Sequence, residues 1–538
     1  MRRVTADEAV KIIRSGDTLL VGGSGGGHAV PEAVMAALGR RFLAEGEPRA
    51  LTVVHPVGLG DDATLGAGHF AHEGLLKRDV GGTFVNSPGI SELSLADKIE
   101  GYTLPQGALS LLMREMAAGR PGLMTETGLH TFVDPRHGGG RQSKCAVEDL
   151  VELVQFRGKE YLFYKPFHID VALLRGTTAD EDGNVTMEEE AVFGEMLSEA
   201  QAARRCGGIV IVQVKRLAKR GTLPAKAVKI PGILVDLVVV EPAQRQTYLT
   251  AYSPSYAGEL KVPLSDIPVL PMNARKVIAR RAAAELFPGA VCNLGSGVST
   301  GIANIAAEED VLEAVCLTNE QGLIGGAPAS GSEAGASRNY AAMIDQPYQF
   351  DFYDGGGLDL AFLSFAEVDA EGNVNVSRFG NRIIGPGGFI NISQNAKCVV
   401  FSGTFTAGKS EIGWPGGVTR IARDGVQPKF VAAVEQITYS GSYGNSRGQR
   451  VLYVTERAVF RLTDGGLELI EIAPGIDLER DVLAKMAFRP AVARELKTMD
   501  ARLFLPVPMG LAKDLAAKPA RAASPRLERF GSAPGAAS

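Results

Sequence analysis

Two segments of this chain repeat one another, and the repeat limits the folds that the sequence can adopt. DVALLRGTTADEDGNVT (170–186) aligns without a gap with DLAFLSFAEVDAEGNVN (359–375). Each segment begins as an apolar strand and ends in a D-x-x-G-N turn. Glycine-rich loops precede both copies, near Gly22 and near Gly295. We therefore expect two related halves that arose by internal duplication, with an insertion in the first half at about residues 60–150.

Strand-like and helical runs alternate within both halves. DTLLVGG leads into PEAVMAALGRRFL, in which Pro31 suits the first helical position, and TADE (5–8) has the form of a capping box. The alternation predicts an α/β protein made of two open α/β domains with mostly parallel sheets. In such sheets ligands bind at the carboxyl ends of the strands, so candidate residues are sought there.

The domain boundaries follow from breaks in this pattern. VPLSDIPVLPM (262–272) carries three prolines, which interrupt both helices and strand ladders. We expect an N-terminal domain at 1–262, a linker at 263–272 and a C-terminal domain at 273–515. The remaining residues, 516–538, are rich in Ala, Pro, Ser and Gly without periodic apolar positions, so we expect them to be disordered.

Composition excludes several classes of function. Among 538 residues, 45% are apolar and 22% charged, as in ordinary globular enzymes, and the net charge of −5 disfavours a nucleic-acid partner. No run of 18 apolar residues is present, so neither a membrane span nor a signal peptide is expected. Five scattered cysteines without a C-x-x-C pair indicate a reducing cytoplasm and no metal site.

One carboxylate stands out as a candidate nucleophile. In CLTNEQGLIGG, Glu320 lies between a strand-like run, Val311–Leu317, and a glycine-rich turn. A glutamate of ordinary pKa, about 4.3, is ionised at pH 7 and can attack an activated carbonyl without a neighbouring base. The alternative is a solvated glutamate at a strand end, and Glu333 and Glu435 are rival carboxylates without a comparable motif.

Two glycine-rich segments could supply the amides that an acyl transfer needs. GPGGFINIS (385–393) and CNLGSGVSTGIANI (292–305) let backbone N–H groups approach a ligand closely. Removing one donor from an oxyanion hole costs about 100- to 1000-fold in rate. We expect the backbone amides near Gly387 and Gly388 to form the oxyanion hole. The alternative is that both glycine-rich segments are ordinary βα turns.

Together these motifs resemble the family I coenzyme A transferases, a family of 3-oxoacid CoA-transferases, and within it the single-chain acetate/propionate group. NEQG (319–322) resembles the E-[NSQ]-G active-site motif, and GPGGF (385–389) resembles the G-x-G-G oxyanion loop. GSGVS (295–299) resembles the G-x-G-x-P coenzyme A loop, except that Ser299 stands where the family has proline. Longer matches, which extend the resemblance to about residue 515, lie at 102–123, 170–191, 346–363 and 473–482.

The resemblance implies a function and a set of site residues. It implies transfer of coenzyme A between short-chain acyl-CoA and free carboxylates, by a ping-pong reaction through a glutamyl-CoA thioester on Glu320. It also implies an active site between the halves, no tightly bound cofactor, and a cytoplasmic homo-oligomer, either a dimer or a tetramer. The implied catalytic residues are Glu320, Gly387, Gly388 and Gln106, with a structural glutamine as the alternative for Gln106, and the implied coenzyme A contacts are Gly295, Ser296, Gly297, Val298, Gly385 and Phe389. Gly403 and Lys409, in the GTFTAGKS segment, are further candidate coenzyme A contacts, with a solvated lysine as the alternative for Lys409.

Other readings of the sequence remain as alternatives. GTFTAGKS (403–410) matches the P-loop pattern of nucleotide hydrolases, but EIGWPGG follows it where the P-loop helix should begin. GGSGGGH near Gly22 fails the dinucleotide fingerprint because His28 stands at the third glycine. A non-catalytic coenzyme A-binding protein would not need Glu320. The acidic run EED (308–310) is interpreted as a solvated helix face.

Overall fold

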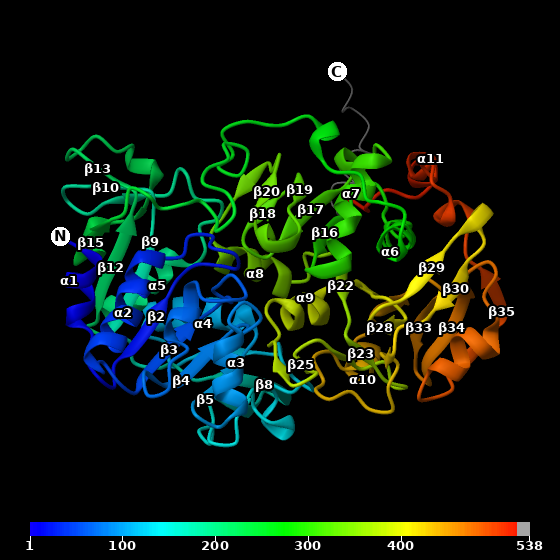
Figure 1. Cartoon of the computed structure of the whole chain (residues 1–538), viewed down its shortest axis with the longest axis horizontal. Coiled ribbons are helices and arrows are strands. Elements are labelled where there is room, and N and C mark those ends of the chain that lie inside the picture. Colours follow the sequence, from blue (N-terminus) through cyan, green and yellow to red (C-terminus); the bar gives the residue numbers. More distant parts are fainter. Residues whose placement is uncertain (524–538) are drawn as a thin grey trace.

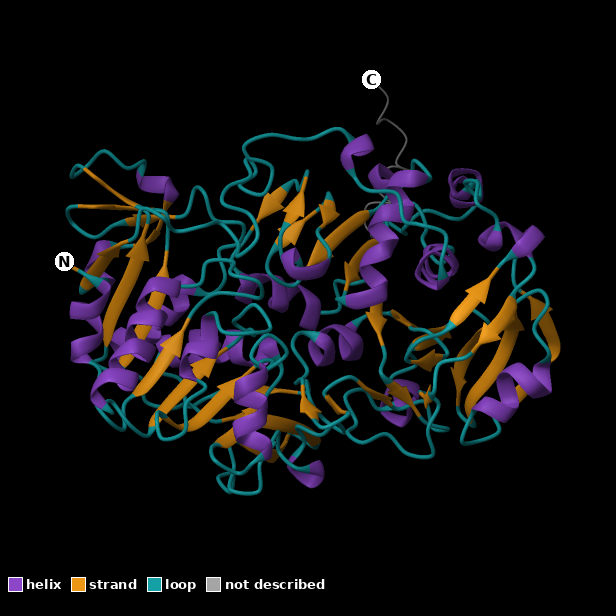
Figure 2. Cartoon of the chain, in the orientation of Figure 1, coloured by secondary structure: helices purple, strands orange, loops and turns teal. Residues whose placement is uncertain are grey.

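The computed structural model describes residues 1–523 and shows one large sheet in each half of the chain (Figure 1). In Figure 2 the strands of the first half lie at the left, and those of the second half run from the upper centre to the right. Helices pack between and around the two sheets. Residues 524–538, the end of the predicted tail, lie outside the described residues. Within the described part, no helix is both long and apolar enough to cross a membrane.

The sheet of the first half is parallel throughout. Its strands, in spatial order, are β1 (Arg2–Val4), β15 (Leu237–Val240), β12 (Ile209–Val214), β9 (Val171–Arg175), β2 (Thr18–Val21), β3 (Leu51–His55), β4 (Leu76–Gly81) and β5 (Glu100–Thr103). The helices of this half are α1 (Ala6–Ala9), α2 (Glu32–Glu45), α3 (Pro88–Leu95), α4 (Gln106–Ala117) and α5 (Met196–Arg205). Two smaller sheets contain β6 (Leu123–Thr125), β7 (Val151–Phe156), β8 (Lys159–Tyr164), β10 (Thr178–Asp180), β11 (Val185–Thr186), β13 (Arg216–Ala218) and β14 (Val228–Ile230).

The large sheet of the second half has a parallel centre with antiparallel pairs on both sides, and its last two strands pair in parallel again. In spatial order its strands are β21 (Ala342–Met343), β18 (Leu323–Ile324), β17 (Cys316–Asn319), β16 (Val291–Leu294), β22 (Leu360–Ser364), β27 (Cys398–Ser402), β32 (Arg450–Val454), β33 (Ala458–Thr463), β34 (Gly466–Ile472) and β35 (Ala491–Thr498). The helices are α6 (Ala274–Ala283), α7 (Gly301–Glu308), α8 (Gln346–Asp354), α9 (Phe389–Asn395), α10 (Gly441–Ser446) and α11 (Leu511–Ala516). Short hairpins contain β19 (Ala327–Pro328), β20 (Ser337–Arg338), β23 (Glu367–Val368), β24 (Val374–Asn375), β25 (Arg378–Phe379), β26 (Arg382–Ile383), β28 (Thr406–Ala407), β29 (Glu411–Gly413), β30 (Arg420–Arg423) and β31 (Gln427–Pro428).

The predicted internal duplication is visible in both topology and detail. The strand order β15-β12-β9-β2-β3 of the first half matches β32-β27-β22-β16-β17 of the second. In each D-x-x-G-N turn the first aspartate, Asp180 or Asp369, accepts hydrogen bonds from the backbone N–H groups two and four residues later, at 2.9–3.1 Å. The side-chain amide of Asn184 or Asn373 reaches the other oxygen at 3.0 Å. The predicted α/β fold is therefore confirmed.

Local signals at the helix starts are also correct, to within one residue. Thr5 and Glu8 form the capping box, with Glu8 N donating to Thr5 Oγ1 at 3.2 Å and Thr5 N donating to the Glu8 carboxylate at 2.8 Å. Pro31 directly precedes α2 instead of opening it.

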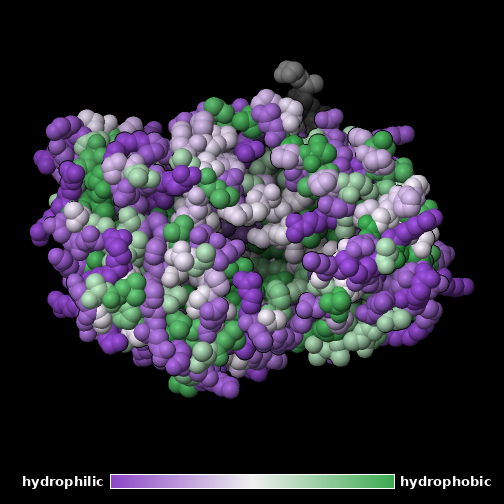
Figure 3. Space-filling model, in the orientation of Figure 1, coloured by the Kyte–Doolittle hydropathy of each residue, from purple (hydrophilic) through white to green (hydrophobic). Residues whose placement is uncertain are grey.

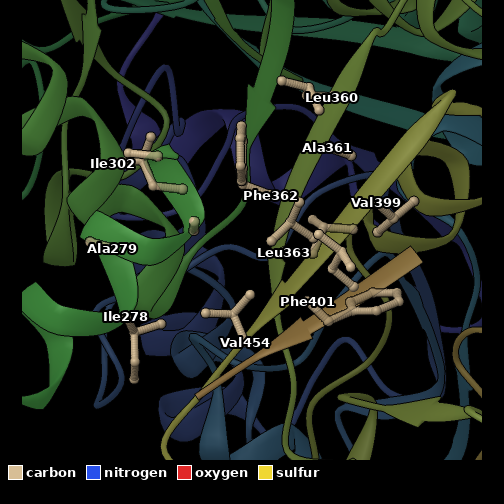
Figure 4. Packing of buried hydrophobic residues seen from close by; sticks show 14 of the residues in the cluster. Ile278, Ala279, Ile302, Leu360, Ala361, Phe362, Leu363, Val399, Phe401 and Val454 are labelled. Atoms are coloured by element: carbon tan, nitrogen blue, oxygen red, sulfur yellow. The ribbon is translucent and has the colours of Figure 1, made fainter. Parts of the chain in front are cut away.

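The core of the second half forms where α6 and α7 cover the parallel strands (Figure 4). Ile278 and Ile302 are fully buried, as are Phe362 and Phe401 on the strands beneath. Burying an apolar side chain of this size stabilises the fold by about 1.5–3 kcal/mol. This packing fixes the carboxyl ends of β16, β17 and β22, where the candidate site lies.

The acidic run EED is not the solvated helix face that its composition suggested. Glu308 forms ion pairs with Lys276 Nζ at 2.7 Å and with Arg280 at 3.3 Å. The Glu309 carboxylate accepts three backbone N–H bonds at 2.6–2.9 Å from residues 509–511, at the start of α11. Only Asp310 is exposed. The partners lie far away in sequence, so a run of like charges could not reveal them.

The first part of the predicted disordered tail makes defined contacts. Lys518 Nζ donates to the Leu286 carbonyl oxygen at 2.6 Å, and Arg521 Nε pairs with Asp359 at 2.7 Å. The prediction of disorder is therefore wrong for residues 516–523, because polar anchors compensate for the missing apolar periodicity. The domain boundaries at 262 and 272 stay predictions.

Candidate active site

A cavity of about 760 Å³ is lined by residues of both halves. Gln106 comes from the first half, and Gly295, Glu320 and Gly388 come from the second. Figure 3 shows the molecule hollowed near the middle of the face in view, with hydrophilic, neutral and hydrophobic residues around the hollow. Three of the sequence motifs thus meet at one place, at the carboxyl ends of parallel strands.

Glu320 directly follows β17 and begins the turn into β18. The predicted strand over Val311–Leu317 starts later, because Leu312–Ala314 forms a 3₁₀ turn. Gly322 has φ of 102°, and a Cβ there would lie 2.0 Å from the Ile344 carbonyl oxygen, so only glycine fits the turn. The turn points the Glu320 side chain into the cavity.

The carboxylate of Glu320 has only weak hydrogen-bond donors around it. Asn293 Nδ2 lies 3.4 Å from Oε2, and Gln321 Nε2 lies 3.3 Å from Oε1. Burial raises the pKa of Glu320 above its ordinary value, and these two amides partly offset the rise. A carboxylate that is incompletely solvated in this way is a better nucleophile than one in water.

Asn293 is itself held by a buried hydroxyl pair. Its Nδ2 donates to the Tyr353 hydroxyl at 3.3 Å, and that hydroxyl lies 2.7 Å from Thr318 Oγ1. These residues lie on β16, α8 and β17. The sequence analysis missed all three, because nothing in their spacing connects them to Glu320.

The GPGGF loop packs directly on Glu320. It forms the turn before α9, and a Cβ at Gly388 would lie 3.4 Å from Glu320 Cγ. The N–H of Gly387 donates to the Gly82 carbonyl oxygen at 2.8 Å, so it is already used. The Gly388 N–H has no acceptor among residues 1–523. Of the two predicted oxyanion donors, the geometry therefore favours Gly388.

The first half anchors the same loop through its backbone. Phe84 N donates to the Ile384 carbonyl oxygen at 2.6 Å, and Gln106 N donates to the Gly387 carbonyl oxygen at 2.8 Å. Gly385, with φ of 88°, fits so closely that an added Cβ would lie 2.9 Å from Thr83 Cα. The position of the loop therefore depends on the contact between the halves.

The predicted Gln106 lies in this contact, at the first position of α4. Its side chain is buried and lines the cavity, and its Nε2 donates to Gln346 Oε1 at 3.2 Å. Its Oε1 lies 3.8 Å from the position that a Cβ on Gly387 would occupy. Gln106 is thus placed beside the turn that holds Gly388.

The predicted coenzyme A loop follows β16 and contributes only part of its residues to the cavity. Gly295 and Ser296 line the cavity, whereas Gly297 and Val298 do not. The segment Gly297–Thr300 is a 3₁₀ turn that runs into α7.

Ser364, at the end of β22, holds this loop and was missed by the sequence analysis. Its Oγ donates to the Ser296 carbonyl oxygen at 2.8 Å and accepts from the Val298 N–H at 3.2 Å. Ser299, at the family's proline position, is buried, and its Oγ lies 3.4 Å from Ser364 Oγ. The serine pair therefore supports a turn that proline would otherwise stiffen.

The remaining predicted contacts divide into two groups. Gly385 and Phe389 line the cavity, whereas Gly403 and Lys409 do not, and Lys409 is exposed. GTFTAGKS (403–410) runs into the hairpin β29–β30 and not into a helix. The P-loop interpretation is therefore wrong, because no helix N-terminus is there to bind phosphates.

Comparison with known proteins identifies the family of this chain. A family model described as coenzyme A transferase matches residues 3–241. The caffeate CoA-transferase of Acetobacterium woodii is 47% identical over 509 residues, spanning 93% of this chain and 97% of the relative. The acetate CoA-transferase YdiF of Escherichia coli K12 is 45% identical over 508 residues, spanning 94% and 96%. The chain belongs to the coenzyme A transferase family.

A solved structure extends the match to three dimensions. The acyl-CoA transferase YdiF of Escherichia coli O157:H7, solved as a thioester complex with CoA, has a TM-score of 0.91 and 44% identity. The match covers 95% of this chain and 97% of that one. The resemblance expected from the sequence motifs is thus confirmed, and the chain is a CoA-transferase.

The first half of the transferase supplies more of the cavity wall than the sequence motifs indicated. The additional lining residues include Ser24, Gly25, Gly26, Val57, Asp61, Asp62, Thr83, Val85, Asn86 and Tyr248. The glycine loop near Gly22, equivalent to the loop near Gly295, was the signal that could have indicated them. The rival carboxylates do not line the cavity: Glu333 accepts from Tyr256 at 2.7 Å, and Glu435 pairs with Arg378 at 3.2 Å.

Proposed function

We propose that the transferase moves coenzyme A between short-chain acyl-CoA, of acetyl, propionyl, butyryl or acetoacetyl type, and free carboxylates. Glu320 is the nucleophile. The observation that carries the proposal is the packing of Glu320 against Gly388, whose N–H is without an acceptor among the described residues, inside a cavity shared by the halves. Nucleophile and oxyanion donor are thus adjacent before any substrate arrives.

The reaction proceeds in two balanced stages. The Glu320 carboxylate attacks the thioester carbonyl, the Gly388 N–H stabilises the oxyanion, and the C–S bond breaks to give a mixed anhydride and CoA thiolate. The thiolate then attacks the glutamyl carbonyl and releases the first carboxylate, leaving a glutamyl-CoA thioester. An acceptor carboxylate reverses both stages, so the energy of the thioester is conserved.

The surroundings of Glu320 serve this sequence of steps. Burial limits access of water, which would hydrolyse the anhydride or the thioester. Gly295, Ser296, Gly385 and Phe389 provide surface for the carrier, and its binding energy can be used at the reacting centre. We assign Gln106 to contact with the reacting carboxyl group, because its amide faces the same part of the cavity.

The nature of the acids is part of the proposal. The relatives named above are called acetate and caffeate CoA-transferases, so both small and aromatic acids belong in a substrate panel. We propose acetate and other short acids as the main acceptors. We also propose a cytoplasmic homo-oligomer that needs no tightly bound cofactor and no metal.

The test is trapping of the covalent intermediate. After exposure to acetyl-CoA and reduction with borohydride, mass spectrometry should show a modified Glu320 in the wild type and none in Glu320→Ala. Transfer from acetyl-CoA to propionate should be abolished in that variant. Glu435→Gln, an exposed carboxylate away from the cavity, is the matched control and should behave as wild type. Transfer retained within about tenfold by Glu320→Ala would exclude Glu320 as nucleophile.

A further inference from the structure

The first half holds two buried carboxyl groups that the proposed reaction does not use. Glu195 and Glu199 lie at the start of α5, with 1% and 0% of their surface exposed. Glu195 Oε2 and both oxygens of Glu199 have no hydrogen-bond partner among residues 1–523. Buried carboxyl groups without partners lower stability, so their presence calls for a reason beyond folding.

A hydrogen-bonded chain leads from Glu195 to the active site. Gln346 Nε2 donates to Glu195 Oε1 at 2.8 Å and lies 3.4 Å from Ser110 Oγ. Gln346 Oε1 accepts from Gln106 Nε2 at 3.2 Å. All four side chains, Glu195, Gln346, Ser110 and Gln106, are buried, with at most 2% of their surface exposed. The chain links α5, α8 and α4, and it ends at the cavity.

The chain sets the direction of each amide in it. Glu195 Oε1 is an acceptor, so it draws the NH₂ group of Gln346 toward itself. The Gln346 carbonyl oxygen then faces Gln106 and draws its NH₂ group inward. Gln106 Oε1, together with the second N–H of Nε2, is left for the cavity. Without Glu195 as acceptor, Gln346 could turn over, and Gln106 would lose its fixed orientation.

The protonation of Glu195 and Glu199 is compatible with Glu195 accepting the hydrogen bond from Gln346. Burial raises the pKa of Glu195 to about 7 and that of Glu199 well above its ordinary value. Asp345 adds to the rise at Glu195, while Lys229 lies 3.4 Å from Asp345. A proton on the unpartnered Oε2 leaves Oε1 free to accept from Gln346, so the orientation of the chain holds in either protonation state.

We propose that Glu195 is a positioning residue of the transferase: through Gln346 it holds the Gln106 amide in the orientation that meets the reacting carboxyl group at Glu320. The inference rests on the proposed function, because it assigns Gln106 to the acyl group. It adds a residue on the far side of α4 that touches neither substrate nor nucleophile.

A double-mutant cycle tests the link. Gln106→Ala and Glu195→Leu should each lower kcat/KM for acetyl transfer by about tenfold, the value of one hydrogen bond. The double variant should be no slower than Gln106→Ala, because Glu195 acts only through Gln106. Glu195→Gln keeps an oxygen acceptor and should restore activity to within about threefold of wild type. Gln346→Met interrupts the chain at its centre and replaces Glu195→Leu if that variant does not fold.

The control is the same chemical change one turn further along α5. Glu199→Leu removes a buried carboxyl group that is outside the chain, and it should leave kcat/KM unchanged. If the losses multiply in the double variant, or if Glu199→Leu loses as much activity as Glu195→Leu, the inference is overturned. So would wild-type activity in Gln106→Ala. None of these results would affect trapping of Glu320, so failure of the proposed function remains distinguishable.

Discussion

The contact between Gly388 and Glu320 predicts a specific kinetic effect of Gly388→Ala. Gly388 has φ of −79° and ψ of −5°, so alanine can adopt its backbone conformation without strain. The new Cβ would lie 3.1 Å from Ile392 Cδ1 and 3.4 Å from Glu320 Cγ. Carbon atoms pack at about 3.5–4.0 Å, so the Ile392 side chain must move by up to about half an ångström, and we expect the new methyl group, already in contact with Glu320 Cγ, to pass that movement on to the carboxylate.

The size of this movement sets the expected loss. A misplacement of about 1 Å can cost about 100-fold in rate, so half of it costs about tenfold. The free energy of unfolding should change little. Alanine reduces the conformational entropy of the unfolded chain, which stabilises the folded state by about 0.4–1 kcal/mol and offsets the cost of the tighter packing. We therefore expect kcat to fall about tenfold while Tm stays within a few degrees of wild type.

The assay is steady-state acetyl transfer together with thermal unfolding of the same samples. Gly385→Ala is the contrasting variant in the same loop. There φ is 88° and the Cβ would lie 2.9 Å from Thr83 Cα, so we expect a lower Tm together with lower activity. A kcat for Gly388→Ala within twofold of wild type would refute the reasoning. A fall in Tm equal to that of Gly385→Ala would mean that the loop collapses instead.

Three further outcomes are expected. Lys409→Ala should leave kcat/KM within twofold of wild type, because Lys409 is exposed and does not line the cavity. The wild type should not hydrolyse ATP with Mg²⁺. An Mg²⁺-dependent ATPase activity that is lost in Lys409→Ala would instead support the P-loop interpretation. Burial lowers the pKa of His28 to about 4, so the unfolded state protonates first and stability falls as the pH drops from 6.5 toward 4. At about 1.4 kcal/mol for each of about 2.5 pH units, the loss approaches about 3 kcal/mol, and equal pH dependence of unfolding in His28→Gln would contradict it. Truncation after residue 523 should leave Tm unchanged, whereas truncation after 516 should lower it, because Lys518 and Arg521 are lost.

The parts of the site that lie within one short motif could be predicted from the sequence. Glu320, the GPGGF loop and the glycine loop near Gly295 each carry their chemistry in a few consecutive residues, and the structure brings all of them to one cavity. The repeat at 170–186 and 359–375 likewise predicted two related halves, and the structure gives their sheets a common strand order.

The parts that depend on contacts between distant residues could not be predicted. Whether Gly387 or Gly388 has a free N–H depends on Gly82, a carbonyl group 305 residues away in the chain. Ser364 supports the loop at Ser296 from the neighbouring strand. Lys409 matched a phosphate-binding pattern, but the pattern does not contain the helix that gives it its effect. In each case the deciding atom lies outside the motif.

The bond between Gly387 and Gly82 also ties the loop beside Glu320 to the first half. Gly387 has φ of 50°, a left-handed conformation that glycine adopts readily. Gly82 accepts the Gly387 N–H, whereas the N–H of Gly388, where an added Cβ would lie 3.4 Å from Glu320 Cγ, has no acceptor among residues 1–523. In the proposed mechanism, a shift of the first half would therefore move the loop that carries the oxyanion donor. The proposed nucleophile belongs to one half, and the position of its proposed oxyanion donor depends on the other.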